Sequence, residues 1–137
     1  MTLDLAKFAN ENQIKFFLMN FTDLFGAQRS KLVPASAISN MQKSGAGFGG
    51  FAAWLDMTPA YPDIFAMPDA EAVIQLPWKP EVAWVPGNLY MNGQKVEQAP
   101  RNVLNTVVER ARKKGIKMMV GVEPEFFLIN EDGTSIS

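Results

Sequence analysis

The fold prediction starts from Lys117-Met-Met-Val-Gly-Val-Glu-Pro-Glu-Phe-Phe-Leu-Ile129, an apolar run that carries two glutamates. Most of its side chains are large and apolar, and a strand needs only about five or six residues. The run is therefore predicted to form one buried strand. Because alternate side chains of a strand share a face, Glu123 and Glu125 should point the same way, with Cα atoms roughly 6–7 Å apart.

The two carboxylates need a partner if this strand is buried. A bare carboxylate in an apolar setting is unfavourable, and two on one face also repel each other. Apart from Lys117, the run has no cationic side chain. An external cation is then the natural partner, and carboxylate oxygens suit Mg²⁺ or Mn²⁺. Alternatively, the strand lies at a sheet edge and both glutamates face water.

Four motifs of this sequence resemble those of glutamine synthetases and occur in the same order as in that family. Val120–Ile129 is similar to the family's first catalytic strand, Gly-x-Glu-x-Glu-Phe-Phe-Leu, whose two glutamates bind divalent metal ions. The other motifs are Phe21-Thr-Asp-Leu-Phe-Gly-x-x-Arg29 in a first hairpin, Ile64-Phe-Ala-Met-Pro-Asp69 before a strand, and Ala99-Pro-Arg101 opening a helix. Together they cover nearly all 137 residues.

The resemblance implies an ATP-dependent ligase that phosphorylates the γ-carboxylate of glutamate and lets ammonia displace the phosphate. It assigns Glu123 and Glu125 as ligands of Mg²⁺ or Mn²⁺, and ATP as co-substrate. The expected reactants are glutamate, ATP and ammonia or a small amine. The parent enzyme is expected to be a homo-oligomer, a ring or double ring, with active sites between subunits.

One loop departs from the family pattern. Many bacterial members carry Phe-Asp-Gly-Ser-Ser there, and its aspartate helps to bind and deprotonate ammonium. By resemblance that position is Gly49 here, while Asp63 matches a second family aspartate and Asp56 could replace the missing carboxylate. Both aspartates would then contribute to the active site of a neighbouring subunit. Otherwise they cap local turns, and the departure makes an amine other than ammonia an alternative substrate.

Composition excludes several other kinds of chemistry. The net charge is −1, so attraction to nucleic acid or membrane is not expected. The chain has no cysteine and no histidine, which excludes disulfides, thiolate chemistry and histidine-based catalysis or zinc binding within it. It shows neither a basic and apolar leader nor an apolar run of about 18 residues. A cytoplasmic protein is predicted.

Local patterns predict the elements of the first hundred residues. Thr2 is expected to cap a helix that ends near Asn12, and Ser36 a helix that Gly45 terminates. The predicted strands are Ile14–Asp23 and Gln28–Val33, paired as an antiparallel hairpin, then Glu71–Pro77, Val82–Val85 and Leu89–Met91, followed by a turn at Asn92-Gly93.

Two segments are predicted to be loops, and one to be a helix. Gly45–Gly50 matches a dinucleotide-binding glycine pattern, but a helical pattern precedes it where a strand is needed; we interpret it as a flexible loop. Phe51–Asp69 has no clear periodicity and is predicted to be irregular. Pro100 should open a helix that ends at Gly115. Its apolar stripe is Val103, Leu104, Val107, Val108 and Ala111.

The predicted fold class is α+β. Residues 1–98 are expected to form a β-grasp-like N-terminal domain, and residues 99–137 the truncated start of a catalytic domain, a helix plus the Glu-x-Glu strand. Members of the family have several hundred residues, so this chain is expected to be a fragment without activity alone. Three hypotheses stay open: a glutamate–ammonia ligase fragment, a fragment of a glutamate–amine ligase such as one forming γ-glutamylmethylamide, and a free-standing β-grasp interaction module.

Overall fold

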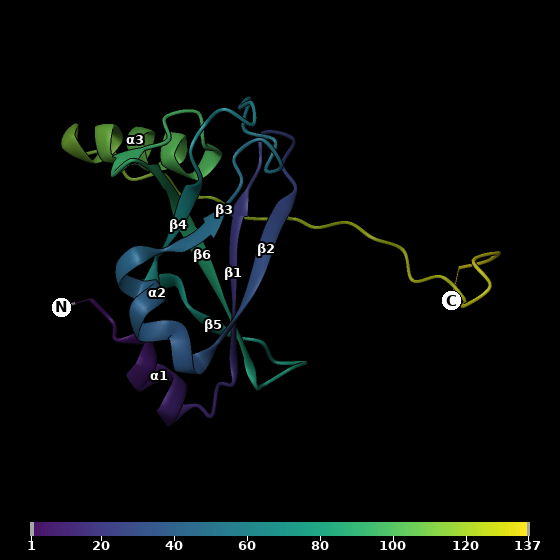
Figure 1. Ribbon diagram of the computed structural model, residues 1–137. Helices are drawn as coiled ribbons and strands as arrows, with labels where there is room; N and C mark the ends of the chain where they lie inside the picture. The colour runs from purple at the N-terminus through teal and green to yellow at the C-terminus, as the bar shows by residue number, and fades with distance from the viewer. Residues whose placement is uncertain (1, 137) are drawn as a thin grey trace. The chain divides into compact units, whose positions relative to one another are not determined.

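A seven-stranded mixed sheet organises the chain, as Figure 1 shows in the computed structural model, which describes residues 2–136. The strand order is β2-β1-β6-β4-β3, and β5 and β7 pair with β6 beside this path. In chain order the elements are α1 (Leu5–Glu11), β1 (Phe16–Thr22), β2 (Gln28–Pro34), η1 (Ala35–Ala37), α2 (Ile38–Ser44), β3 (Ala46–Phe48), β4 (Ile64–Pro68), η2 (Ala70–Ala72), β5 (Ile74–Gln75), β6 (Val82–Met91), β7 (Gln94–Lys95) and α3 (Pro100–Lys113).

The chain divides by its internal contacts into two units, one up to Val107 and one from Val108 onward. All named strands belong to the first unit. The predicted α+β class is confirmed as a mixed sheet combined with helices. Among the described residues, no helix has the length and apolar character needed to cross a membrane.

β1 and β2 form the antiparallel hairpin that the sequence predicts. The Asp23 side chain organises the turn, because its Oδ1 accepts hydrogen bonds from the backbone amides of Phe25 and Ala27, both at 2.9 Å. Gly26, at φ +84°, takes the left-handed conformation that closes the turn. The hairpin is therefore fixed by one aspartate and one glycine.

β6 is the longest strand and changes its partner halfway. As far as Pro86 it runs parallel to β1, and from Gly87 onward it pairs antiparallel with β4. A Cβ atom on Gly87 would lie 2.8 Å from the Cβ of Ala66, so only glycine lets the strands approach here. The two short strands predicted from the sequence are thus one continuous strand, which leads into the predicted Asn92-Gly93 turn.

β2 and β3, the first and last strands in the sheet order, contact each other through their side chains. The Lys31 ammonium of β2 donates a hydrogen bond to the carbonyl oxygen of Gly47 and lies 4.9 Å from the ring centroid of Phe48. Phe21 of β1 meets the same ring edge to face, with centroids 4.8 Å apart. The sheet is therefore curled rather than flat.

The core lies on one face of this sheet, under the two N-terminal helices that Figure 1 shows side by side. Alternation along β1 places Phe17 and Met19 in the core, both fully buried, with Leu18 and Asn20 on the other face. The helices contribute side chains at helical spacing. These buried helix residues are Leu5, Ala9, Ile38 and Met41.

The helix caps differ in part from the prediction. Asp4, not Thr2, caps α1, because its Oδ1 accepts from the amides of Ala6 and Lys7. Ser36 does not cap α2, since it lies inside the preceding short 3-10 helix η1. Gly45 ends α2 at φ +79°, as predicted.

Two segments predicted to be loops contain strands. Gly45–Gly50 includes β3, and Phe51–Asp69 includes β4, which pair antiparallel with each other. Glu71–Pro77, predicted to be one strand, is divided between the 3-10 helix η2 and the two-residue strand β5. Periodicity missed β3 and β4 because they are short and their pairing joins residues distant in sequence.

The predicted buried strand Lys117–Ile129 is not present in this structure. A strand needs hydrogen-bonding partners, yet within the described residues the segment makes only an isolated bridge, from Ile129 to Ile136. Its side chains are exposed, Val122 at 85 % and Phe127 at 80 %. The segment is apolar in sequence, but no other part of residues 2–136 packs over its side chains.

Candidate functional site

The predicted metal ligands Glu123 and Glu125 lie in the exposed extended segment of the second unit. Their oxygens are of the type that Mg²⁺ and Mn²⁺ prefer. Two carboxylates supply only part of a six-coordinate shell, and no group of three or more metal-ligating side chains occurs among residues 2–136. The donor chemistry therefore fits a hard cation, while the set of donors within the described residues is incomplete.

Asp56 and Asp63 lie in the long connection between β3 and β4, and both are exposed. The connection is anchored by Ala53 and Leu55, which are buried in the core, and by a 3.1 Å hydrogen bond from Gln98 Nε2 to the Leu55 carbonyl. Its side chains alternate inward and outward. Asp56, at φ +56°, follows buried Leu55 and faces solvent.

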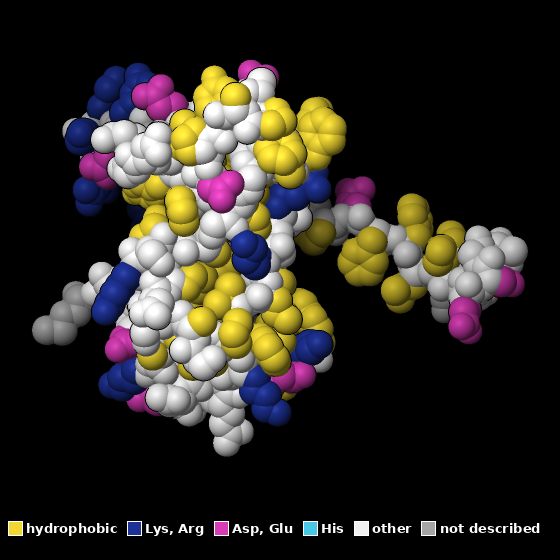
Figure 2. All heavy atoms as spheres, viewed as in Figure 1, with side chains coloured by type: hydrophobic (Ala, Val, Ile, Leu, Met, Phe, Trp, Pro, Cys, Tyr) yellow, Lys and Arg dark blue, Asp and Glu magenta, His cyan; other side chains and the backbone are white. Residues whose placement is uncertain are grey.

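Aromatic side chains are exposed beside these aspartates. Trp54 is 55 % exposed and meets Phe25 of the β1–β2 turn edge to face, with ring centroids 5.6 Å apart. The Leu24 amide donates to the Trp54 carbonyl and joins the two loops through their backbones. Figure 2 shows hydrophobic side chains gathered on the surface of the molecule in this view. Asp56 and Asp63 both lie on this exposed connection, and neither forms an ion pair with another described residue.

An ion pair between a buried carboxylate and a partly exposed arginine fixes the neighbouring β1–β2 turn. The Asp23 carboxylate is fully buried, and its Oδ2 accepts from Arg29 Nε at 2.8 Å. Burial acts to raise the pKa of Asp23, but hydrogen bonds from the Ala27 amide, Arg29 and the Phe25 amide outweigh it and lower the pKa. The ionised carboxylate is thus part of the folded structure rather than a proton donor.

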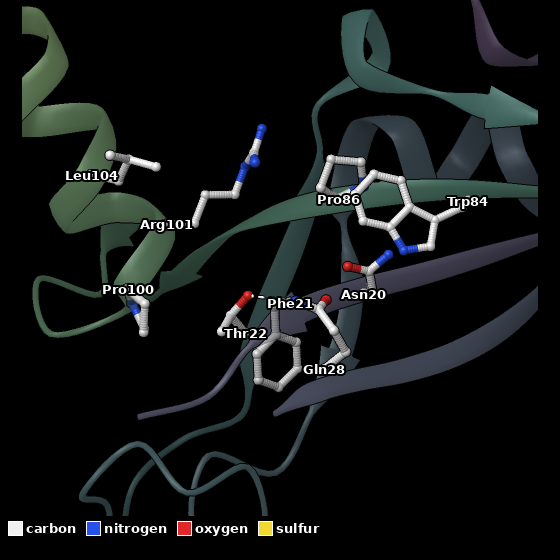
Figure 3. Close-up of a pocket in the computed structure, with 9 residues that line it drawn as sticks. All are labelled: Asn20, Phe21, Thr22, Gln28, Trp84, Pro86, Pro100, Arg101 and Leu104. Carbon is white, nitrogen blue, oxygen red and sulfur yellow. Dashed lines mark hydrogen bonds between the residues drawn. The ribbon is translucent and has the colours of Figure 1, made fainter. Parts of the chain in front are cut away.

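A cavity that sequence reasoning did not predict lies on the face of the sheet opposite the core. It is lined by β1, β6 and the start of α3, and Figure 3 shows its residues. Arg101 spans one side and pairs through Nη2 with Asp69 Oδ2 at 2.6 Å. Asn20, a polar residue within the apolar strand β1, was the available signal in the sequence.

These features define a class of protein: a mixed α/β domain followed by an exposed apolar segment with two paired carboxylates. Comparison with known families gives a match to the catalytic domain of glutamine synthetase at residues 97–136. A glutamine synthetase of Rhizobium leguminosarum is 62 % identical over all 137 residues, which span 32 % of that relative. The chain belongs to the glutamine synthetase family and spans about a third of the length of these curated relatives.

Two further comparisons involve relatives with other names. A glutamate–methylamine ligase of Methyloversatilis universalis is 35 % identical over 130 residues, 93 % of this chain and 29 % of the relative. The solved structure called "GmaS/ADP complex-Conformation 1" is 56 % identical and superposes with a TM-score of 0.80, covering 83 % of this chain and 26 % of that one. The structure "Apo GmaS without ligand" has the same identity and TM-score and covers the same share of this chain.

Proposed function

We propose that this chain is the N-terminal part of an ATP-dependent ligase that joins the γ-carboxylate of glutamate to ammonia. The observation that carries the proposal is the 62 % identity to a glutamine synthetase along the whole chain. The β-grasp description of residues 1–98 and a catalytic domain beginning at residue 99 belong to the same proposal. The family match from residue 97 supports this boundary.

A second candidate is a ligase that uses methylamine or another small amine instead of ammonia. Two observations favour it: the 56 % identity to the GmaS structures and the name of the methylamine ligase relative. Gly49 adds to them, because the resemblance places an ammonium-binding aspartate there. A glycine has no carboxylate with which to hold an ammonium ion.

Within this proposal Glu123 and Glu125 would hold Mg²⁺ or Mn²⁺, which would supply positive charge beside the phosphates of ATP. The other ligands come from chain outside residues 2–136. Asp56 and Asp63 contribute to the site of a neighbouring subunit in a cytoplasmic homo-oligomer. Their exposure on an anchored connection supports that role, since a partner can reach them.

The test is ATP- and glutamate-dependent phosphate release by the longer protein, with ammonium or methylamine as the second substrate. We expect turnover with at least one of them, and the ratio of their kcat/KM values decides between the two candidates. The 137-residue chain alone should release no phosphate, because it lacks the remaining ligands. A longer protein inactive with both amines would refute the ligase assignment.

A further inference from the structure

The turn Asn92-Gly93 joins β6 to β7 and is the one Asn-Gly pair in the chain. Both residues are exposed and have positive φ, +50° and +76°, as in a tight two-residue hairpin turn. The pair also favours a covalent reaction, because the backbone nitrogen that follows an asparagine can attack its side-chain carbonyl carbon. Glycine leaves this nitrogen unshielded, and a Cβ on Gly93 would meet no atom within 4 Å.

The two reacting groups of this turn are not held by hydrogen bonds. Among residues 2–136, neither the Asn92 side chain nor the Gly93 amide has a hydrogen-bond partner. Asn10 and Asn40 lie within α1 and α2, where the amide that follows serves the helix. The remaining asparagines use their side chains in hydrogen bonds, and they are Asn12, Asn20, Asn88, Asn102, Asn105 and Asn130.

Ring closure between the two groups requires the backbone of the turn to rotate, and the structure keeps this rotation local. At the base of the hairpin, the Val96 amide donates to the Leu89 carbonyl oxygen at 3.0 Å. Asn102 Nδ2 donates to the carbonyl oxygens of both residues, at 2.7 Å and 2.9 Å. Beyond this base, β7 consists only of Gln94 and Lys95, both exposed. Short exposed segments open at low free energy, so the tip can open while the base stays in place.

We propose that Asn92 deamidates through a succinimide that it forms with Gly93. The Gly93 nitrogen loses its proton and bonds to Asn92 Cγ, the bond from Cγ to Nδ2 breaks, and Nδ2 takes up the proton and leaves as ammonia. Water then adds to either carbonyl carbon of the ring. Opening at Cγ gives aspartate, and opening at the backbone carbon gives isoaspartate. No group is oxidised or reduced.

The products differ from the parent chain in charge and in backbone length. Either product adds one carboxylate to a chain whose net charge is −1. Isoaspartate also lengthens the backbone by one carbon atom, which a two-residue turn does not fit, so β7 should detach from β6. The Asn102 hydrogen bonds should keep the base of the hairpin folded. The turn is therefore a site at which the chain modifies itself without an enzyme.

Asp132-Gly133 provides a comparison within the same chain, because an aspartate before a glycine can form the same ring. Here, however, both reacting groups are engaged. The Gly133 amide donates to the Asn130 carbonyl oxygen at 2.8 Å, and Asp132 Oδ1 accepts from the Thr134 amide at 3.0 Å. Hydrogen bonds from Thr134 also lower the pKa of Asp132, and an ionised carboxylate resists attack by a nucleophile. Asp132 should therefore react far more slowly than Asn92.

The test is incubation of the 137-residue chain at mildly alkaline pH, followed by digestion and mass spectrometry that separates aspartate from isoaspartate. We expect deamidation at Asn92 to be at least about ten-fold faster than at any other asparagine, a difference of about 1.4 kcal/mol in activation free energy. Isoaspartate should be among the products, and the rate should rise with pH. Isoaspartate is the decisive product, because direct hydrolysis of the side-chain amide gives aspartate alone.

A variant checks the assignment of the site. Asn92→Gln keeps a side-chain amide but would need a six-membered ring, so it should accumulate no acidic product at position 92. If this variant does not fold, the products of the unaltered chain still decide. Reaction at Asn92 no faster than at other asparagines, aspartate without isoaspartate, or isoaspartate formed as fast at Asp132 would each overturn the proposal.

Discussion

Asp23 is the residue whose ionisation is most clearly tied to the fold. Its pKa is lowered from the ordinary 3.8 although burial opposes this, because the Ala27 amide, Arg29 and the Phe25 amide donate to it. A carboxyl whose pKa is lower in the folded state stabilises that state above its unfolded pKa. The stabilisation is lost as the pH falls through the folded pKa. The relevant window therefore lies at and below about pH 3.8.

We predict that Asp23→Asn lowers the melting temperature at pH 7 and removes part of its acid dependence. The amide keeps the shape of the side chain but cannot pair with Arg29 as an anion. Thermal melts at a series of pH values measure both effects, and Asp63→Asn, at an exposed position, is the matched control. An Asp23→Asn chain that melts like the parent at pH 7 would contradict the prediction.

Single residues also show what the sequence could reveal. Gly45 was identified correctly as the residue that ends a helix, because its positive φ follows from local chain reversal. Asn20 was not singled out, since its importance comes from Val85, which is 65 positions away. The roles of Glu123 and Glu125 came from spacing and resemblance, and they remain predictions.

At the scale of elements, β6 depends on a close approach that only glycine allows. A Cβ on Gly87 would lie 2.8 Å from the Ala66 Cβ and 3.3 Å from the Asn20 carbonyl oxygen. We predict that Gly87→Ala destabilises the fold by about 1–3 kcal/mol through overpacking. Gly47→Ala in β3 is the control, because its Cβ would meet only the Phe65 ring at 3.6 Å. Urea unfolding measures the difference, and equal midpoints for the two variants would disprove it.

Local signals predicted some elements well and others poorly. The β1–β2 hairpin and the helix beginning at Pro100 have nearby turn or helix-start residues, and both are present. β3 and β4 have no such signals, because their stability comes from pairing with each other and with β6. Lys117–Ile129 has the composition of a strand but no partner strand among residues 2–136. Composition alone therefore predicted a buried strand that is not formed.

At the scale of the whole molecule, the exposed apolar side chains need an explanation. On α3, Val103, Leu104 and Val107 are each about half exposed. In the extended segment, Phe126 and Phe127 are 76 % and 80 % exposed. Exposed apolar patches such as each of these mark sites of interaction. The chain spans about a third of its curated relatives, and the proposal of a longer enzyme provides the surface that covers these residues.

The same proposal gives Glu123 and Glu125 different roles in the two forms of the protein. In the 137-residue chain both are exposed, so Glu123→Gln or Glu125→Gln should change the free energy of unfolding by less than about 0.5 kcal/mol. In the longer enzyme each substitution would remove one charged metal ligand. We expect the affinity for Mg²⁺ or Mn²⁺ to fall about ten-fold or more, since even residues that only support metal ligands contribute that much.

Metal titration of the longer enzyme, followed through both metal binding and phosphate release, measures this expectation. The matched control is Glu131→Gln, which removes an equal charge from the same exposed segment but lies outside the Glu-x-Glu pair. Its metal affinity should equal that of the parent. If the Glu123 and Glu125 variants also keep the parent's metal affinity, the two glutamates do not hold the ion. The two glutamates would then be solvated side chains only, and the metal ligands of the longer protein would lie elsewhere in its chain.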